Sequence, residues 1–400
     1  MSDHNTRSII EEILASLDIP ESAYDKAEAR YKDLGEWFDR EEAKCSPFGP
    51  HIYPQGSFRL GTVVRPLHGR LEYDLDLGCR LRWGITKYTH TQRQLKALVG
   101  TDLEAYRRAR RIEDALEEKN RCWRLPYKDQ SSFHIDAVPS IPEDDATKAS
   151  LQESMIKAGS VEALAQSVTS HAGAITDKRS PGYQQISPYW KISNSEGFAL
   201  WFESRMKLAP QLLQENALMA KAAKVDDLPA RKWKSPLQQA IQILKRHRDV
   251  MFEEDWESAP ISVIITALSA AAYQGEADAA SAIERILSGM HLYVRQTTPR
   301  VPNPVNPAED FADKWHDPQY AHLHLEQNFW NWLEAAKRDF KIIVGARDVT
   351  YLDEQVRAKF AASIDKDRLT EKLGLASINV ITRPKVHVVS ETPAKPWARN

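Results

Sequence analysis

Cysteine, long apolar runs and an excess of positive charge are all scarce in this chain of 400 residues. Its three cysteines, Cys45, Cys79 and Cys122, are odd in number and lack the spacing of metal ligands, which argues against a disulfide framework and for a reducing compartment. The longest nearly apolar run, 261–273, is too short to span a bilayer, and the amino terminus has no signal-peptide core. We therefore expect a cytoplasmic protein that does not act at a membrane.

The charge balance also excludes one class of partner. The formal net charge is −2, so the chain has no basic excess with which to hold a nucleic-acid duplex, and no duplex activator is expected. Hydrophobic residues make up 42% of the chain, which at this length is enough for two packed domains or one large two-lobed unit.

The most informative stretch is an alternating segment that ends at Leu81. From Leu71 onward apolar and polar residues alternate, the pattern of a half-buried strand, and Asp74 and Asp76 fall on its polar face. Their Cα atoms would lie roughly 6.5 to 7 Å apart at the usual strand rise. Two carboxylates at that separation can converge on hard cations, which prefer oxygen ligands.

A turn precedes this strand. Gln55, Gly56 and Ser57 stand where the chain should enter a short helix that continues toward Thr62. Backbone amides and a hydroxyl in such a position can bind phosphate, although a Gly-Ser turn by itself is usually only a loop.

A second alternating segment, 131–139, carries Asp136 on its polar face. The prediction is that this strand joins the same sheet, so that Asp136 lies with Asp74 and Asp76. A nucleotidyltransferase needs such a set: a triphosphate anchor, two metal-binding carboxylates beside it, and a third carboxylate from another strand.

The segments GSFRLGT, EYDLDL and FHIDAVP, with KSPLQQAIQILKRHRD and PISVIITAL further on, resemble the bacterial cGAS/DncV-like nucleotidyltransferases. These CD-NTases make cyclic oligonucleotide second messengers in CBASS anti-phage defence. The resemblance runs from the first long helix to about residue 270. It implies an α+β fold, with a polymerase-β-like core and long N-terminal helix joined to an all-helical C-terminal lobe. It also implies two Mg²⁺ ions, with Mn²⁺ as a possible substitute, nucleoside triphosphate substrates and release of pyrophosphate.

The resemblance also assigns substrate-binding residues in the second half of the chain. It makes Lys245 the triphosphate lysine and Ser262 a second phosphate contact, and it places Ser193 and Asn194 close to the donor nucleotide. Each assignment has an ordinary alternative. Lys245 could belong to a solvated KRHR face together with Arg246, Ser262 could be a plain helix start, and the Ser-Asn segment could only cap a helix.

The expected organisation has three parts. Residues 1–195 would form the catalytic core including the N-terminal helices, 196–374 a helical lobe that completes the nucleotide cleft, and 375–400 a C-terminal tail. Within the core a helix is expected at about 102–119, with its arginines in ion pairs on a solvated face. Some family members end in a small residue that is conjugated to other proteins, and Asn400 puts that behaviour in doubt here.

The predicted activity is synthesis of a cyclic oligonucleotide, most simply a purine cyclic dinucleotide such as cyclic GMP-AMP made from ATP and GTP. A downstream effector that binds the product and CBASS accessory proteins would be the partners. A related transferase could instead add nucleotides to RNA ends or to protein hydroxyls. A nucleotide sensor without catalysis is a further alternative, disfavoured because a sensor does not need all three carboxylates.

Overall fold

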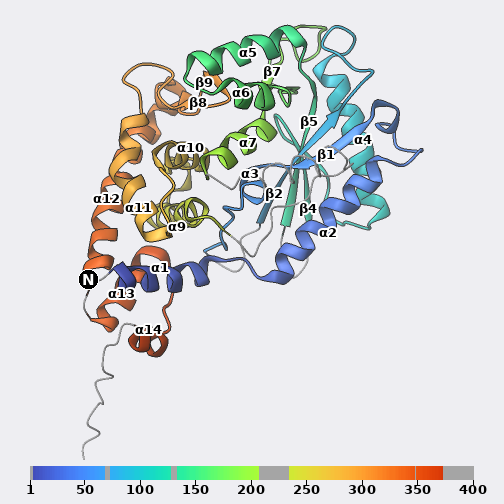
Figure 1. Cartoon of the computed structure of the whole chain (residues 1–400). Helices are drawn as coiled ribbons and strands as arrows, with labels where there is room; N and C mark the ends of the chain where they lie inside the picture. The colour runs from blue at the N-terminus through green and yellow to red at the C-terminus, as the bar shows by residue number, and fades with distance from the viewer. Residues whose placement is uncertain (1–2, 68–72, 128–132, 207–233, 347, 373–400) are drawn as a thin grey trace, which may run out of the picture.

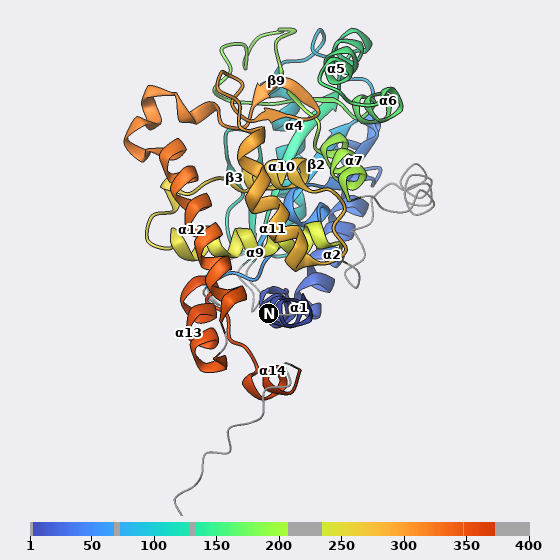
Figure 2. The same cartoon turned by 60° about the vertical axis from the view of Figure 1, so that its left-hand side comes forward.

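The computed structural model describes residues 3–67, 73–127, 133–206, 234–346 and 348–372. It has two lobes: one built on a seven-stranded mixed sheet, and one built mainly of helices, shown from two directions in Figures 1 and 2. The predicted α+β class is therefore confirmed, and the C-terminal tail lies outside the described residues.

The sheet brings the two predicted aspartate strands together. Its strands are β1 (Pro50–Pro54), β2 (Tyr73–Leu81), β3 (Glu117–Glu118), β4 (Trp123–Tyr127), β5 (Phe133–Pro142), β6 (Gly173–Ile175) and β7 (Lys191–Ser193). The order is β1-β2-β5-β4-β3, with β6 and then β7 added at the end of β5. Strands β2 and β5 are parallel neighbours, and their register sets Asp76 opposite Asp136 and Asp74 opposite His134.

In the part of the chain that the structure describes, five helices belong to this lobe; the first three bury the apolar faces of the strands, and the last two form a small separate core with Val305. They are α2 (Glu21–Phe38), α3 (Gly56–Arg59), α4 (Gln92–Ala109), α5 (Asp145–Lys157) and α6 (Glu162–Thr169). Helix α2 inserts Tyr31, Leu34 and Phe38 into the core of the sheet, where all three are fully buried. These three residues recur at three- and four-residue intervals, the spacing of a helix face that packs against a core.

The helix expected at about 102–119 is wrong in its bounds. Helix α4 begins ten residues earlier, because Thr91 and Gln94 form a capping box at its start. It ends at Ala109, and 117–118 pairs with β4 as a strand. The predicted ion pairs do form, with both Arg107 and Arg108 bonded to Glu104.

The helical lobe gathers segments from both ends of the chain. It comprises α1 (Asp3–Leu17), α7 (Ser195–Arg205), α9 (Pro236–Met251), α10 (Ser262–Ala272), α11 (Ala279–Gly289), α12 (Leu325–Gly345), α13 (Val349–Phe360) and α14 (Lys366–Lys372). Single 3-10 turns occur at Ser46–Phe48, Trp256–Ser258, Met290–Tyr293, Asp313–Trp315 and Pro318–Leu323.

Two features of this lobe depart from expectation. Helix α1 packs into the helical core, with Ile9, Ile13 and Leu17 buried there, rather than against the sheet like α2. The lobe is also not all helical, because β8 (Pro302–Asn303) and β9 (Asn306–Asp310) form a hairpin within it. The predicted domain boundary at residue 195 stays a prediction.

Helix α9 lies at the centre of the helical lobe, in contact with α1, α10, α11, α12 and α13. Ser235 and Gln238 close a capping box at its start, and Pro236 takes the first helical position. Its KRHR segment is buried, with Arg246 only 3% exposed and bonded to the carbonyl oxygen of Arg65. The solvated KRHR face considered above is therefore wrong. Among the described residues no helix is both long and apolar enough to cross a membrane.

Candidate functional site

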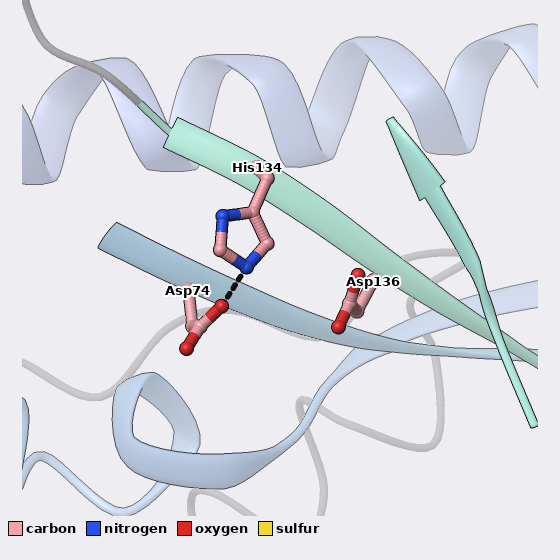
Figure 3. Close-up of side chains that lie close together, drawn as sticks. All are labelled: Asp74, His134 and Asp136. Atoms are coloured by element: carbon pink, nitrogen blue, oxygen red, sulfur yellow. Dashed lines mark ion pairs between the residues drawn. The ribbon is translucent and has the colours of Figure 1, made fainter. Parts of the chain in front are cut away.

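The three predicted aspartates lie on one face of two adjacent parallel strands. Asp74 and Asp76 project from β2 and Asp136 from β5, and the side chains of Asp74 and Asp136 approach each other across the strands (Figure 3). Ligand atoms of Asp74, Asp136 and His134 all lie within 4.8 Å of one another. The structure therefore places the predicted carboxylates together and adds a histidine to them.

Asp76 links these carboxylates to the Gly-Ser turn. Gly56 has a φ of +58°, and a Cβ atom added there would lie 2.2 Å from Oδ2 of Asp76. Only glycine fits between this backbone conformation and the carboxylate. Burial, followed by the charges of Asp74 and Asp136, raises the pKa of Asp76 to about 7. The three carboxyl groups thus lie beside the turn that sequence reasoning assigned to phosphate.

Two residues that the sequence analysis did not assign hold the carboxylates in place. Arg124 on β4 donates two hydrogen bonds to Asp136, of 2.8 and 2.7 Å. His134 forms an ion pair with Asp74 through its Nε2 atom (Figure 3). His134 could have been found from the alternation of β5, since it shares the polar face with Asp136. Arg124 could not, because the register of β4 against β5 is set only in the folded sheet.

The donor set of this cluster fits a divalent cation. Asp74, Asp76 and Asp136 offer carboxylate oxygens, the ligands that hard divalent ions prefer. Burial, followed by the charges of Asp74 and Asp136, raises the pKa of Asp76, so a cation bound at this position would favour its ionised form. His134 offers a nitrogen, which such ions use less, and its contact with Asp74 suits it to orient that carboxylate.

A cavity of about 600 Å³ opens between the two lobes next to Asp76. Its lining includes every other residue predicted to bind substrate: Gln55, Gly56, Ser57, Thr62, Ser193, Asn194, Lys245 and Ser262. These residues come from segments that are nearly 210 positions apart in sequence, so the fold assembles one site from the separate predictions. Their individual roles remain predictions.

Lys245 reaches this cavity from α9. Its ammonium donates a 3.0 Å hydrogen bond to the carbonyl oxygen of Thr62, and the side chain is only 6% exposed. Burial, followed by the charge of Arg248, lowers the pKa of Lys245 to about 8. An ammonium has three N–H donors, so one bond to Thr62 leaves donor capacity for an anionic ligand.

The other predicted contacts have defined local bonds. Ser262 is the first residue of α10, and its hydroxyl accepts a 3.2 Å hydrogen bond from Arg248. Asn194 caps α7, since its Oδ1 accepts from the N–H of Gly197 and its Nδ2 donates to the carbonyl of Val168. The capping interpretation therefore holds for Asn194, whose side-chain amide is already bonded at both ends. Ser193 ends β7 and lines the cavity.

The far end of the cavity is lined by residues that sequence reasoning missed. They come from the loop before β4, from β7, from α7, and from the β8–β9 hairpin with the residue that follows it: Arg121, Lys191, Phe198, Asn303, Glu309 and Phe311. Lys191 on β7 and Glu309 on β9 form a 3.2 Å ion pair between the two lobes. No sequence pattern identified this end, because the hairpin lies in a stretch rich in proline and takes its position from packing.

A carboxylate set on paired β-strands, a glycine turn against one carboxylate and a buried lysine across the cavity define a nucleotidyltransferase. Residues 50–140 match the family described as "Cyclic GMP-AMP synthase DncV-like, nucleotidyltransferase domain". The part of the chain that carries the three aspartates is therefore a DncV-like nucleotidyltransferase domain, in agreement with the resemblance of its motifs to the CD-NTases.

Similarity to known proteins extends along most of the chain. A c-di-GMP synthase of Roseivirga ehrenbergii is 26% identical over 87% of this chain and 84% of its own length. The CD-NTase CdnG of Bradyrhizobium diazoefficiens, solved with GTP, shares the fold at a TM-score of 0.62 and 20% identity, covering 92% of this chain and 98% of that one. DncV of Vibrio cholerae, solved with the linear intermediate pppA(3′,5′)pG, shares it at a TM-score of 0.51 and 16% identity, covering 91% and 88%.

Proposed function

We propose that this chain joins two purine nucleoside triphosphates into a cyclic dinucleotide and releases pyrophosphate at each of two steps. The observation that carries the proposal is that Asp76, grouped with Asp74 and Asp136 on the sheet, lines a cavity that Lys245 enters from the other lobe. A cavity of about 600 Å³ is within the usual size range of small-molecule sites. The site therefore has room for small nucleotides.

In each step a ribose hydroxyl of one nucleotide attacks the α-phosphate of the other. A new P–O bond forms, the bond to pyrophosphate breaks, and the hydroxyl proton leaves. Mg²⁺ ions, when bound by the three aspartates, would acidify the hydroxyl and neutralise charge on the phosphates. Mn²⁺ could substitute for them.

The chain's own residues position the phosphates. Ser57 and the backbone at Gly56 would contact them from the sheet lobe, while Lys245 and Ser262 would contact them from the helical lobe. Because these groups lie on different lobes, they hold the triphosphate in one orientation against the aspartates. Positioning and electrostatic stabilisation are the main contributions that a protein makes to phosphoryl transfer.

Two products are candidates. Cyclic GMP-AMP follows from the family resemblance of the motifs, and cyclic di-GMP follows from the name of the Roseivirga relative. In either case the product would act in anti-phage (CBASS) signalling in the cytoplasm by binding an effector protein. Addition of nucleotides to RNA ends or protein hydroxyls remains the alternative activity of such a site.

The test is to incubate the purified protein with Mg²⁺ and labelled ATP and GTP, without any acceptor. A cyclase gives a small product that resists phosphatase, whereas a terminal transferase gives none until RNA or protein is added. Nucleotide analysis of the product then identifies its bases and its 2′ or 3′ linkages. Recovery of only acceptor-dependent labelling would contradict the proposal.

A further inference from the structure

We propose that Glu309 selects guanine at the end of the cavity furthest from the aspartates; this inference rests on the proposed function. The cavity is lined by Asp76, Ser57 and Lys245 and also by Asn303 and Glu309.

Glu309 pairs with Lys191 on β7. Strand β7 pairs with β6, which joins β5 at Ser140, about 13 Å beyond Asp136 at the usual strand rise. Glu309 therefore marks a second end of the cavity, away from the aspartates at the first. With the phosphates at the first end, the base of the same nucleotide reaches the second.

The second end has walls that suit a purine ring. Phe198 on α7 and Phe311 beyond β9 both line it, with ring centroids 6.0 Å apart and planes inclined by 73°. Ile175 and Ile192 line it from the sheet lobe. Flat aromatic and aliphatic surfaces of this kind bury a base without selecting which base it is. Selection must therefore come from a polar group among them.

Glu309 is that group, and two neighbours fix its carboxylate. Oε1 forms the 3.2 Å ion pair with Lys191, and Oε2 accepts a 2.8 Å hydrogen bond from Nδ2 of Asn303. Asn303 is itself buried and accepts a bond from the N–H of Val305. Each carboxylate oxygen can accept more than one hydrogen bond, so both keep acceptor capacity toward the cavity.

A fixed carboxylate distinguishes the bases by their Watson–Crick edges. Guanine presents two parallel donors, N1–H and the N2 amino group, which match the two oxygens of one carboxylate. Adenine presents the lone pair of N1 at the same place and would be repelled. Uracil has one donor between two acceptors, and cytosine has an acceptor beside its amino group. Glu309 therefore favours guanine over the other three.

This choice also predicts the product. In the first step the donor nucleotide loses pyrophosphate, and the linear intermediate keeps the triphosphate of the acceptor nucleotide. Ring closure requires that second triphosphate to enter the same donor site, so each nucleotide places its base beside Glu309 once. A site that requires guanine at both steps makes cyclic di-GMP from a mixture of ATP and GTP.

Binding of α,β-methylene analogues by calorimetry tests the inference without turnover. The wild type should bind the guanosine analogue more tightly than the adenosine analogue. Loss of a charge-assisted pair should make Glu309→Gln bind the guanosine analogue about 10- to 150-fold more weakly, with adenosine binding unchanged or improved. Glu153→Gln, which removes a carboxylate from the exposed face of α5, is the matched control and should behave as wild type.

Two results would overturn the inference: equal weakening of both analogues in Glu309→Gln, or tighter wild-type binding of the adenosine analogue. Thermal melting of each variant checks that it is folded. Inosine triphosphate lacks the N2 amino group. It should displace the guanosine analogue from the wild type less well than GTP does, and it should displace the analogue from Glu309→Gln as well as GTP does.

Product analysis gives the last arm. Equimolar ATP and GTP should yield cyclic di-GMP, and cyclic GMP-AMP as the main product would contradict selection at both steps. These experiments separate the two proposals. If the wild type forms no cyclic product, but Glu309→Gln still weakens binding of the guanosine analogue, only the proposed function is contradicted. If cyclic product forms, but Glu309→Gln has the same base preference as the wild type, only this inference is contradicted.

Discussion

The two ends of the cavity are assembled in different ways. We call the end proposed to bind phosphate the phosphate end, and the end proposed to hold the base the base end. The phosphate end uses groups close together in sequence: Gly56 and Ser57 stand within 20 residues of Asp76, and a parallel strand adds Asp136. The base end joins β7 to the β8–β9 hairpin, which are more than 100 residues apart and belong to different lobes. Chemistry common to the family can therefore be encoded in short motifs, whereas selectivity depends on how the lobes pack.

The ends also differ in electrostatics. At the phosphate end Asp76 and Lys245 both have pKa values shifted toward neutrality, because burial opposes their charged forms. At the base end Glu309 is paired with Lys191 and bonded to Asn303. The phosphate end thus holds charge that a bound triphosphate and cations would compensate. The charge of Glu309 at the base end is already compensated by Lys191, so it needs no bound ion to balance it.

The contrast between the two ends of the cavity is tested most directly by removing charge from the carboxylate cluster. The double variant Asp74→Asn with Asp76→Asn should lose product formation completely, because amides cannot supply the negative charge that the cations need. Its thermal stability without nucleotide should equal or exceed that of the wild type, because the repulsion between neighbouring carboxylates is relieved. Cyclic product from the folded double variant would remove the site assignment.

Lys245 tests the phosphate end from the other lobe. Lys245→Met should raise the KM for the triphosphate about 10- to 150-fold, since a charge-assisted hydrogen bond to phosphate is lost. Residual activity should survive at high triphosphate, because Ser57 and the aspartates remain in place. Steady-state kinetics with GTP and ATP measures the effect.

The control for Lys245 must be chosen from the structure. Arg246 is adjacent in sequence, but it is buried and bonded to the carbonyl of Arg65, so its loss would disturb the fold. Lys341 is exposed to solvent on α12, so Lys341→Met makes the same change of side chain away from the cavity and should leave KM unchanged. Equal curves for the Lys245 and Lys341 variants would show that the helical lobe contacts substrate through other residues.

The extent of sequence prediction follows the same division. Strand alternation predicted β2 and β5 and the shared face of Asp74, Asp76 and Asp136, because a period of two fixes side-chain direction locally. Arg124 and Glu309 were missed, since each gains its place only through pairing with a distant segment. The start of α4 was missed for a local reason, the Thr91 capping box, which the sequence contained.

A change in the packing of the β8–β9 hairpin should affect activity less than the loss of the aspartate charges or of the Lys245 charge. Val305, fully buried between the hairpin and helices α5 and α6, contacts Met155, Ala165 and Val168. Val305→Ala leaves a small cavity there and should cost about 1 to 2 kcal/mol of stability. The position of Glu309 should loosen with it, so that the preference for GTP over ATP falls a few-fold. Val356→Ala, equally buried in α13, is the matched control and should lose stability while keeping the preference.

The smallest expected effect is a dependence of stability on pH. In the unfolded chain Lys245 titrates near its ordinary pKa of about 10.4, whereas in the fold its pKa is about 8. Below pH 8 both states bind the proton and the cost of burying the charge is fully present. Between these two pKa values the unfolded state binds more protons than the folded state, so stability rises with pH.

Lys245→Met lacks this titration, so urea unfolding of the two proteins without nucleotide isolates it. Between pH 7 and 9.5 the wild type should gain about 1 to 2 kcal/mol relative to the variant. Lys96, whose pKa is also lowered to about 8 by burial, is present in both proteins and cancels in the difference. If the difference in the free energy of unfolding between the two proteins is constant across this range, the Lys245 ammonium is solvated in the cavity and its pKa is not lowered. The phosphate end would then carry no unbalanced positive charge for a triphosphate to compensate, and the electrostatic contrast between the two ends would disappear.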